Sequence, residues 1–192
     1  MQTNIFVISG GPGVGKTTIV NELEKLKYAV IPEAARIVAE SDKRFLGKSV
    51  NEINHKKFQE EILKRQIQMQ ENFLLKNHEF GFSDRGFGDS MVYCKIRNVN
   101  FPKKYLDYVK SFRYLGVFVL EPLRFYKTDG LRVETKEEQQ EIHDEIVGVY
   151  ENLGYDLIKI PQMPVEERIA MILEKRQKSL KSEKEISSIK IS

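Results

Sequence analysis

An apolar run that stops at a cluster of glycines near the N-terminus limits the folds open to this chain. Residues 4–9 read NIFVIS, and residues 10–17 read GGPGVGKT. The first stretch is short and rich in β-branched and aromatic residues, which is typical of a buried strand. The second fits the pattern G-x-x-x-x-G-K-[ST], and we expect it to lead into a helix over residues 17–26. A strand, a glycine-rich loop and a helix in this order predict a cradle for phosphate groups.

The glycine-rich loop predicts a binding site for a nucleoside triphosphate. Its glycines let the backbone approach a polyphosphate closely, and the start of the following helix adds a positive end. We expect Lys16 to reach the β- and γ-phosphates and the Thr17 hydroxyl to bind Mg²⁺. ATP or GTP is therefore the expected phosphate donor, with Mg²⁺ as cofactor. The predicted phosphate-binding residues are Gly10, Gly11, Pro12, Gly13, Val14, Gly15, Lys16, Thr17 and Thr18.

Strand-like and helix-like segments alternate along the rest of the chain. Further strands are expected over residues 28–31, 79–84, 114–120 and 155–160, and further helices over residues 32–40, 52–77, 91–96, 141–154 and 165–174. This alternation predicts an α/β fold in which helices cover both faces of a parallel sheet. Ligands of such sheets bind beyond the C-terminal ends of the strands. The candidates for function are therefore the side chains that follow Ser9, Ile31, Asp84 and Leu120.

An acid and a base stand together at the end of the third expected strand, in the stretch FGFSDRGFG (80–88). Asp84 ends an apolar run, as a Walker B acid does. Such an acid is suited to holding Mg²⁺ through water or to taking the proton of an acceptor hydroxyl. The planar guanidinium of Arg85 is suited to an anionic substrate or a phosphate. A structural ion pair at a strand end is the alternative interpretation.

The residue after Asp84 distinguishes three classes of triphosphate-binding protein. Motor ATPases usually place a Glu there to activate water, and Arg85 cannot act as a base. A GTPase switch would show D-x-x-G, but Gly86 comes one place early and the sequence contains no N-K-x-D motif. We therefore interpret the Asp-Arg pair as that of a small-molecule kinase.

The second expected strand leads into IPEAAR, which places Glu33 at a helix start and Arg36 one turn later. We expect Glu33 to bind metal-bound water or the acceptor hydroxyl. Arg36 and Arg85 are expected to bind the acceptor. An acid at a helix N-terminus also stabilises the helix, so a structural role for Glu33 is the alternative. The residues alone leave open whether Asp84 or Glu33 is the catalytic base.

The segment after the fourth expected strand, EPLRFYKTDGLRVETKEEQQ, carries basic side chains around a flexible Asp-Gly pair. Residues 121–140 are expected to form a lid over the triphosphate, because phosphoryl transfer is catalysed mainly by positioning and charge neutralisation. Arg132 is the catalytic candidate in this lid, and Arg124 and Lys127 are candidates for phosphate binding. A solvated basic loop is the alternative.

The formal net charge of +3 is unevenly distributed. Six of the 31 Lys and Arg residues, but only two of the 28 Asp and Glu residues, lie in residues 175–192. Residues 1–174 are thus nearly neutral, which argues against a nucleic-acid partner. We expect residues 1–174 to form one domain and residues 175–192 to be a basic, flexible tail. A weak electrostatic contact of this tail with a partner or acidic lipid is the alternative.

Composition and the N-terminal residues bear on the cellular compartment of the protein. No apolar run approaches the ~20 residues of a membrane helix, and the N-terminus does not resemble a signal peptide. The single cysteine, Cys94, excludes an internal disulfide. The three histidines, His55, His78 and His143, lack metal-binding spacing and are expected on surfaces or helix faces. These features predict a cytoplasmic protein without a membrane span.

Five stretches in order, FVISGGPGVGKTT, PEAAR, FSDRGFGDS, YKTDGLR and GYDLIKIP, carry a resemblance to a known family. Together they resemble the AAA-type P-loop domain shared by NadR-like ribosylnicotinamide kinases and many predicted ATPases, including the TRPL-translocation-defect proteins. The resemblance covers about residues 4–174. It implies a P-loop NTPase fold of the nucleotide-kinase type, with a five-stranded parallel sheet, bound ATP or GTP with Mg²⁺, and a lid around Arg132. Glu33 and the Asp84–Arg85 pair resemble the equivalent acid and acid–Arg pair of nucleoside and nucleotide kinases.

These observations together predict a Mg²⁺-dependent phosphotransferase. It would move the γ-phosphate of ATP or GTP to an unidentified small hydroxylated acceptor, such as a nucleoside or a vitamin. The predicted catalytic residues are Lys16, Asp84, Glu33 and Arg132, and the predicted metal ligands are Thr17 and Asp84. Two alternatives use the same cradle: a nucleoside triphosphatase that hydrolyses ATP or GTP, and a nucleotide-dependent binding protein.

Overall fold

Five strands form one parallel sheet in the part of the chain that the structure describes. The structure is a computed structural model, and it describes residues 1–122 and 135–189. The strands are β1 (Ile5–Ser9), β2 (Ala29–Ile31), β3 (Gly81–Asp84), β4 (Gly116–Leu120) and β5 (Leu157–Ile160). They lie in the order β2-β3-β1-β4-β5, and all neighbours are parallel. The predicted α/β fold with a five-stranded parallel sheet is confirmed.

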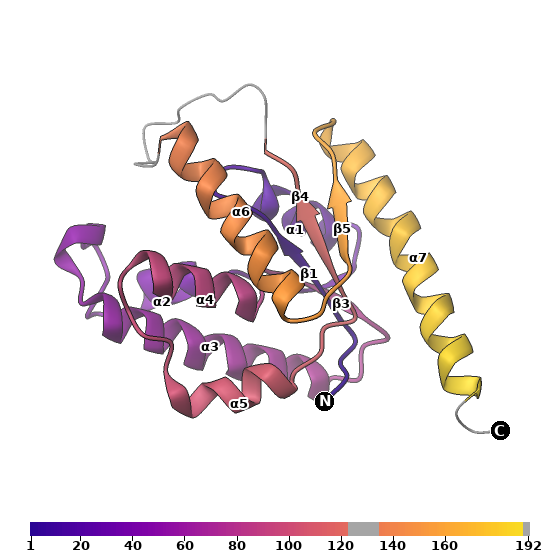
Figure 1. Ribbon diagram of the computed structural model, residues 1–192, viewed down its shortest axis with the longest axis horizontal. Coiled ribbons are helices and arrows are strands. Elements are labelled where there is room, and N and C mark those ends of the chain that lie inside the picture. The colour runs from indigo at the N-terminus through magenta and orange to yellow at the C-terminus, as the bar shows by residue number, and fades with distance from the viewer. Residues whose placement is uncertain (123–134, 190–192) are drawn as a thin grey trace.

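Helices cover both faces of the sheet (Figure 1). They are α1 (Lys16–Lys25), α2 (Ala34–Ser41), α3 (His55–Leu75), α4 (Phe87–Ile96), α5 (Lys103–Ser111), α6 (Lys136–Asn152) and α7 (Val165–Ile189), with a short 3₁₀ turn at Val50–Glu52. Helices α1 and α7 pack on one face, and α3 to α6 pack on the other. Helix α2 packs against α3. This layered arrangement buries a core on each side of the sheet.

Strand β1 is central and buried on both sides. Ile5 and Val7 pack into the core beneath α3 to α6, whereas Phe6 and Ile8 pack into the core beneath α1 and α7. Because both faces are covered, the strand is continuously apolar instead of alternating between apolar and polar residues.

The register of the strands brings the predicted functional segments together. Ile8 of β1 is paired with Asp84 of β3, and Ile31 of β2 is paired with Ser83. The C-terminal ends of β1, β2 and β3 therefore lie at one edge of the sheet. The glycine-rich loop, Glu33 and Arg85 all follow directly from this edge.

Two helices begin earlier than expected. Helix α6 begins at Lys136, where residue 141 was expected, because Thr135 and Glu138 form a capping box: the Thr135 hydroxyl accepts the Glu138 N–H, and the Glu138 carboxylate accepts the Thr135 N–H. Helix α4 begins at Phe87, where residue 91 was expected. The Asp89 carboxylate accepts the Gly86 N–H there and satisfies a free donor at the helix start.

The structure also contains one helix that was not expected and one that is longer than expected. Helix α5 was missed, although its apolar side chains, Tyr105, Tyr108 and Val109, recur at helical spacing and pack into the core. Helix α7 was expected to end near Glu174 but continues to Ile189. Residues 165–189 contain no glycine or proline, so no residue in them strongly opposes a helix. The division of the chain at residue 174 and the flexibility of the tail stay predictions.

The predicted lid is described only at its two borders. Residues 123–134 lie outside the described residues, and with them Arg124, Lys127 and Arg132. Glu121 and Pro122 follow β4, and residues 136–140 form the start of α6. Within the described residues, no helix is both long and apolar enough to cross a membrane.

Candidate active site

The phosphate loop (residues 10–17) joins the end of β1 to α1 and has a backbone shape that requires glycine. Gly10 has a φ of 126°, in a region that side chains disfavour. A Cβ atom at Gly10 would lie 2.6 Å from the carbonyl oxygen of Leu120. The loop therefore begins with a close approach to the end of β4.

Lys16 lies inside the loop and is almost fully buried. Its ammonium donates hydrogen bonds to the carbonyl oxygens of Gly10 and Gly11, at 2.8 and 2.6 Å. Burial, reinforced by the Arg85 charge, lowers the pKa of Lys16 to about 7, against the opposing effect of nearby carboxylates. A phosphate anion at this position would favour the charged ammonium, because an opposite charge stabilises it.

Thr17 and Asp84 meet across the two strand ends. The Thr17 hydroxyl donates to Asp84 Oδ2 at 2.8 Å. Asp84 is 3% exposed, and its Oδ1 has no hydrogen-bond partner among the described residues. Burial, followed by the nearby Glu33 charge, raises the pKa of Asp84. The Thr17 hydroxyl and the Asp84 carboxylate, whose Oδ1 is buried and free, form a donor set that fits Mg²⁺, a cation that prefers oxygen ligands.

Glu33 and Arg85 form an ion pair beside this donor set. Arg85 Nε lies 2.8 Å from Glu33 Oε1, and Arg85 Cζ lies 4.9 Å from the centre of the Tyr93 ring. Glu33 is the N-cap residue of α2, but its side chain makes no capping hydrogen bond. Both the predicted role of Glu33 at the acceptor and its alternative, stabilisation of the helix start by its charge, stay predictions. Arg85 has a φ of 73°, a strained backbone for a non-glycine residue.

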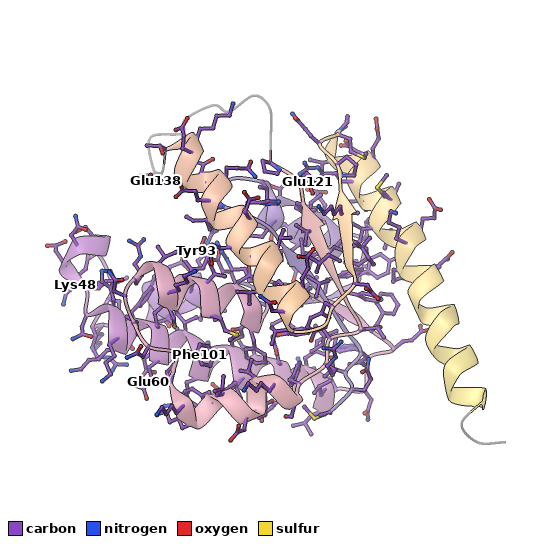
Figure 2. The ribbon with its side chains drawn as sticks, in the orientation of Figure 1. Lys48, Glu60, Tyr93, Phe101, Glu121 and Glu138 are labelled. Carbon is purple, nitrogen blue, oxygen red and sulfur yellow. The ribbon has the colours of Figure 1, made fainter. Side chains whose placement is uncertain are left out.

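A cavity of about 560 Å³ opens beside the phosphate loop. The loop and the end of β3 form one end of this phosphate-loop cavity, and α2, α3 and α4 form its walls. It is lined by Lys16, Thr17, Glu33, Arg36, Phe58, Gln59, Gln66, Asp84, Arg85 and Tyr93, among others. Tyr93 lies on α4, on the side that faces α6 (Figure 2). The structure thus brings the predicted residues of three separate motifs around one cavity.

Two buried amides line the phosphate-loop cavity and were not predicted. Gln59 and Gln66 are each about nine-tenths buried or more on α3. The Ser90 hydroxyl donates to Gln66 Oε1 at 2.8 Å. Glutamines recur at positions 59, 66 and 70, at helical spacing on the apolar side of α3. This spacing in the sequence could have predicted that they are buried.

Asp89 connects three elements behind the cavity. Its carboxylate accepts hydrogen bonds from the Ser9 hydroxyl at 2.9 Å, the Gly86 N–H at 2.9 Å and the Tyr150 hydroxyl at 2.7 Å. It thereby joins the end of β1, the start of α4 and α6. Sequence reading missed Asp89 because two of these partners are more than 60 residues away.

A Tyr150→Phe change tests this network. We expect it to lower the free energy of unfolding by about 1–3 kcal/mol, because a buried carboxylate loses one of its donors. Tyr28→Phe is the matched control, since the Tyr28 hydroxyl has no hydrogen bond among the described residues, and it should change stability by less than about 0.5 kcal/mol. Urea unfolding followed by circular dichroism measures both. Equal stability of the two variants would contradict the role given to Asp89.

Arg168 on α7 holds the phosphate loop from behind. Its guanidinium donates to the carbonyl oxygens of Val14 at 2.6 Å, Glu121 at 3.2 Å and Pro161 at 3.1 Å. The loop, the end of β4 and the end of β5 are thus tied to one side chain. The sequence predicts that Arg168 lies in the last helix, but no local pattern in the sequence indicates this contact.

His143 was expected on a surface or helix face, but it is buried against the loop. Its Nδ1 accepts the Gly11 N–H at 3.2 Å. The expectation failed because the residues that cover His143 come from the start of the chain and from the end of β4, far away in sequence.

Comparison with known proteins supports this description of the fold. Deoxyadenosine kinase from M. mycoides is similar, with a TM-score of 0.59 and 18% identity over 91% of this chain and 99% of that one. NadR protein is similar in two complexes. The complex with NAD and AMP-PNP has a TM-score of 0.64 and 17% identity, over 90% of this chain and 49% of that one. The complex with NR has a TM-score of 0.60 and 17% identity, over 82% and 43%.

These similarities concern the fold, because the sequence identities are low. The chain spans less than half the length of the NadR chains. A search of curated proteins finds no match.

A family model described as an AAA domain matches residues 5–168, which is most of the chain. The resemblance to AAA-type P-loop domains and to NadR is thereby confirmed. The chain therefore belongs to this AAA domain family, as a P-loop nucleotide-binding domain whose fold is related to that of deoxyadenosine kinase and NadR.

Proposed function

We propose that this protein is a Mg²⁺-dependent phosphotransferase that moves the γ-phosphate of ATP or GTP to a hydroxyl of a small metabolite. The observation that carries this proposal is the phosphate-loop cavity, which gives a second small molecule room directly beside Lys16 and Asp84. Two neighbours in fold support a nucleoside-like acceptor. One is a deoxyadenosine kinase with product dCMP bound, and the other is NadR protein in complex with NR.

The triphosphate end of the proposed site consists of the phosphate loop and the strand ends. The loop N–H groups and Lys16 would bind the phosphates, as in other proteins with this loop. Thr17 and Asp84 would hold Mg²⁺, since their oxygens meet and one Asp84 oxygen is otherwise free. When bound, Mg²⁺ neutralises charge on the β- and γ-phosphates.

The acceptor end of the proposed site lies between α2, α3 and α4. We assign Glu33 as the general base, because Asp84 is already engaged with Thr17, whereas Glu33 is held beside the cavity by Arg85. Glu33 takes the hydroxyl proton as the acceptor oxygen bonds to the γ-phosphorus and ADP or GDP leaves. Arg85 and Arg36 favour an acceptor with negative charge or polar groups.

The lining contributed by α3 and α4 suits a planar, polar group on the acceptor. Phe58 and Tyr93 offer aromatic rings, and Gln59 and Gln66 offer amide groups that can donate and accept hydrogen bonds. This combination favours a nucleoside or a vitamin over an aliphatic alcohol. The roles of Arg132, Arg124 and Lys127 over the triphosphate stay predictions, because these residues lie outside the described part of the chain.

The decisive experiment measures ADP and GDP release by the purified protein with Mg²⁺, alone and with each member of a panel of nucleosides, nucleotides and vitamins. We expect one panel member to increase release many-fold and to appear as a phosphorylated product in mass spectrometry. Steady release that no panel member changes would instead indicate a nucleoside triphosphatase. Nucleotide binding without any release would indicate a nucleotide-dependent binding protein.

A further inference from the structure

The imidazole of His143 joins the first turn of the phosphate loop to α6. The Gly11 N–H donates to His143 Nδ1 at 3.2 Å, and the His143 side chain is 4% exposed. The backbone at Gly11 is pressed against α6: a Cβ atom there would lie 2.9 Å from both the Gln139 carbonyl oxygen and the Cβ of His143. One hydrogen bond and a close contact therefore fix the position of the loop relative to α6.

The same ring has a second possible partner on its other side. Because Nδ1 accepts a hydrogen bond, it carries no proton, so the neutral ring carries its proton on Nε2. Nε2 lies 3.9 Å from Glu121 Oε2. Glu121 follows the C-terminal end of β4 (Figure 2). The other carboxylate oxygen of Glu121 is buried and has no hydrogen-bond partner within residues 1–122 and 135–189. A negative charge thus lies beside the ring and would pair with its protonated form.

We propose that neutral His143 holds the phosphate loop in its nucleotide-binding shape, and that protonation of His143 releases the loop and weakens triphosphate binding. A proton on Nδ1 would face the Gly11 N–H, and two donors cannot bond to each other. The charged ring pairs with Glu121 instead. His143 is a positioning residue in this account, since it acts on the phosphates through the loop backbone. The inference rests on nucleotide binding at the loop and needs no acceptor.

The surroundings of His143 favour the neutral ring near pH 7. Burial is the largest influence and lowers the pKa of His143; Glu121 and Asp144 oppose this effect, and Lys16 and Lys159 reinforce it. These charged groups belong to the end of β4, to α6, to the start of α1 and to β5. Since the pKa lies below the ordinary histidine value of about 6.5, the loop is held at neutral pH and released in acid.

The test compares the wild-type protein with His143→Asn and His143→Leu. The Asn amide oxygen can replace Nδ1 as acceptor for the Gly11 N–H and does not titrate, whereas Leu fills the space without an acceptor. The dissociation constants of methylanthraniloyl-labelled ATP and GTP with Mg²⁺ are measured by fluorescence from pH 5 to pH 8. Circular dichroism at each pH shows that the proteins are folded.

We expect the ratio of the wild-type to the Asn dissociation constant to be close to one at pH 8. Below the His143 pKa this ratio should rise, by up to about tenfold per pH unit, because a proton and the nucleotide then compete for the protein. Lys16 and the nucleotide also titrate in this pH range. Their effect on the dissociation constant is the same for the wild-type protein and for His143→Asn, so it cancels in the ratio. The Leu variant should bind about tenfold more weakly at pH 7.5, since a buried N–H loses its acceptor.

Parallel pH profiles of the wild-type protein and His143→Asn would overturn the proposal, even if the Leu variant did not fold. Wild-type affinity in a folded Leu variant at pH 7.5 would overturn it as well. Failure to find an acceptor would count against the phosphotransferase alone, because this binding assay contains no acceptor.

Discussion

A Lys16→Ala variant is expected to bind ATP and GTP about a hundredfold more weakly than the wild-type protein, because removing one member of a buried charge pair costs about 2–5 kcal/mol. Lys16 is 6% exposed and lies within the loop, hydrogen-bonded to two loop carbonyl groups. Without its ammonium, the phosphates would lose the cation that lies inside the loop. Isothermal titration calorimetry with Mg²⁺ and each nucleotide measures the loss.

Lys25→Ala is the matched control for this variant. Lys25 is on the same helix, but it is exposed, and within residues 1–122 and 135–189 its ion pair is with Glu22, one turn earlier. Its removal should leave nucleotide affinity within about twofold, because exposed ion pairs contribute little. Wild-type affinity in a folded Lys16→Ala variant would show that the loop is not the phosphate site.

A Glu33→Gln variant should lose about 10²- to 10⁴-fold in kcat for the acceptor found with the metabolite panel, the usual contribution of a general base. Gln keeps the shape of Glu33, but it has no charge to pair with Arg85 and cannot take a proton at neutral pH. Nucleotide affinity should stay within about twofold, because the role proposed for Glu33 is at the acceptor and not at the triphosphate. Initial rates at saturating nucleotide measure kcat, and calorimetry measures the affinity.

Glu40→Gln serves as the control, since Glu40 is an exposed residue near the end of the same helix. It should have wild-type kcat. If Glu33→Gln also kept wild-type kcat, the base would not be Glu33, and Asp84 would be the remaining acid beside the phosphates. If both kcat and nucleotide affinity fell together, Glu33 would act on the triphosphate site as a whole.

The sequence was sufficient to predict the residues at the strand ends. Lys16 and Thr17 belong to a local motif, and Asp84 follows an apolar run that reads as a strand. Their meeting follows from a general rule, because parallel strands expose their C-terminal ends at one edge of the sheet. The structure accordingly places Thr17 and Asp84 2.8 Å apart at their oxygens.

The supporting contacts were beyond prediction because they join distant parts of the chain. His143 reaches Gly11 from 132 residues away, and Arg168 reaches Val14 from 154 residues away. Neither residue belongs to a motif, and no local pattern records which element will pack beside it. Helix lengths failed for a different reason: Thr135 and Glu138 form a cap that a search for apolar spacing does not detect.

The central position of β1 affects how the protein must be synthesised. Ile5 and the rest of β1 leave the ribosome before the strands they pair with, since Ile5 pairs with Gly81 and Phe6 pairs with Gly116. This central, largely apolar strand therefore lacks its partners until residues 81–84 and 116–120 have been translated. Contacts between residues this distant in sequence slow folding, and until they form, apolar segments that promote aggregation are exposed. The newborn chain should accordingly be prone to aggregation until β3 and β4 have emerged.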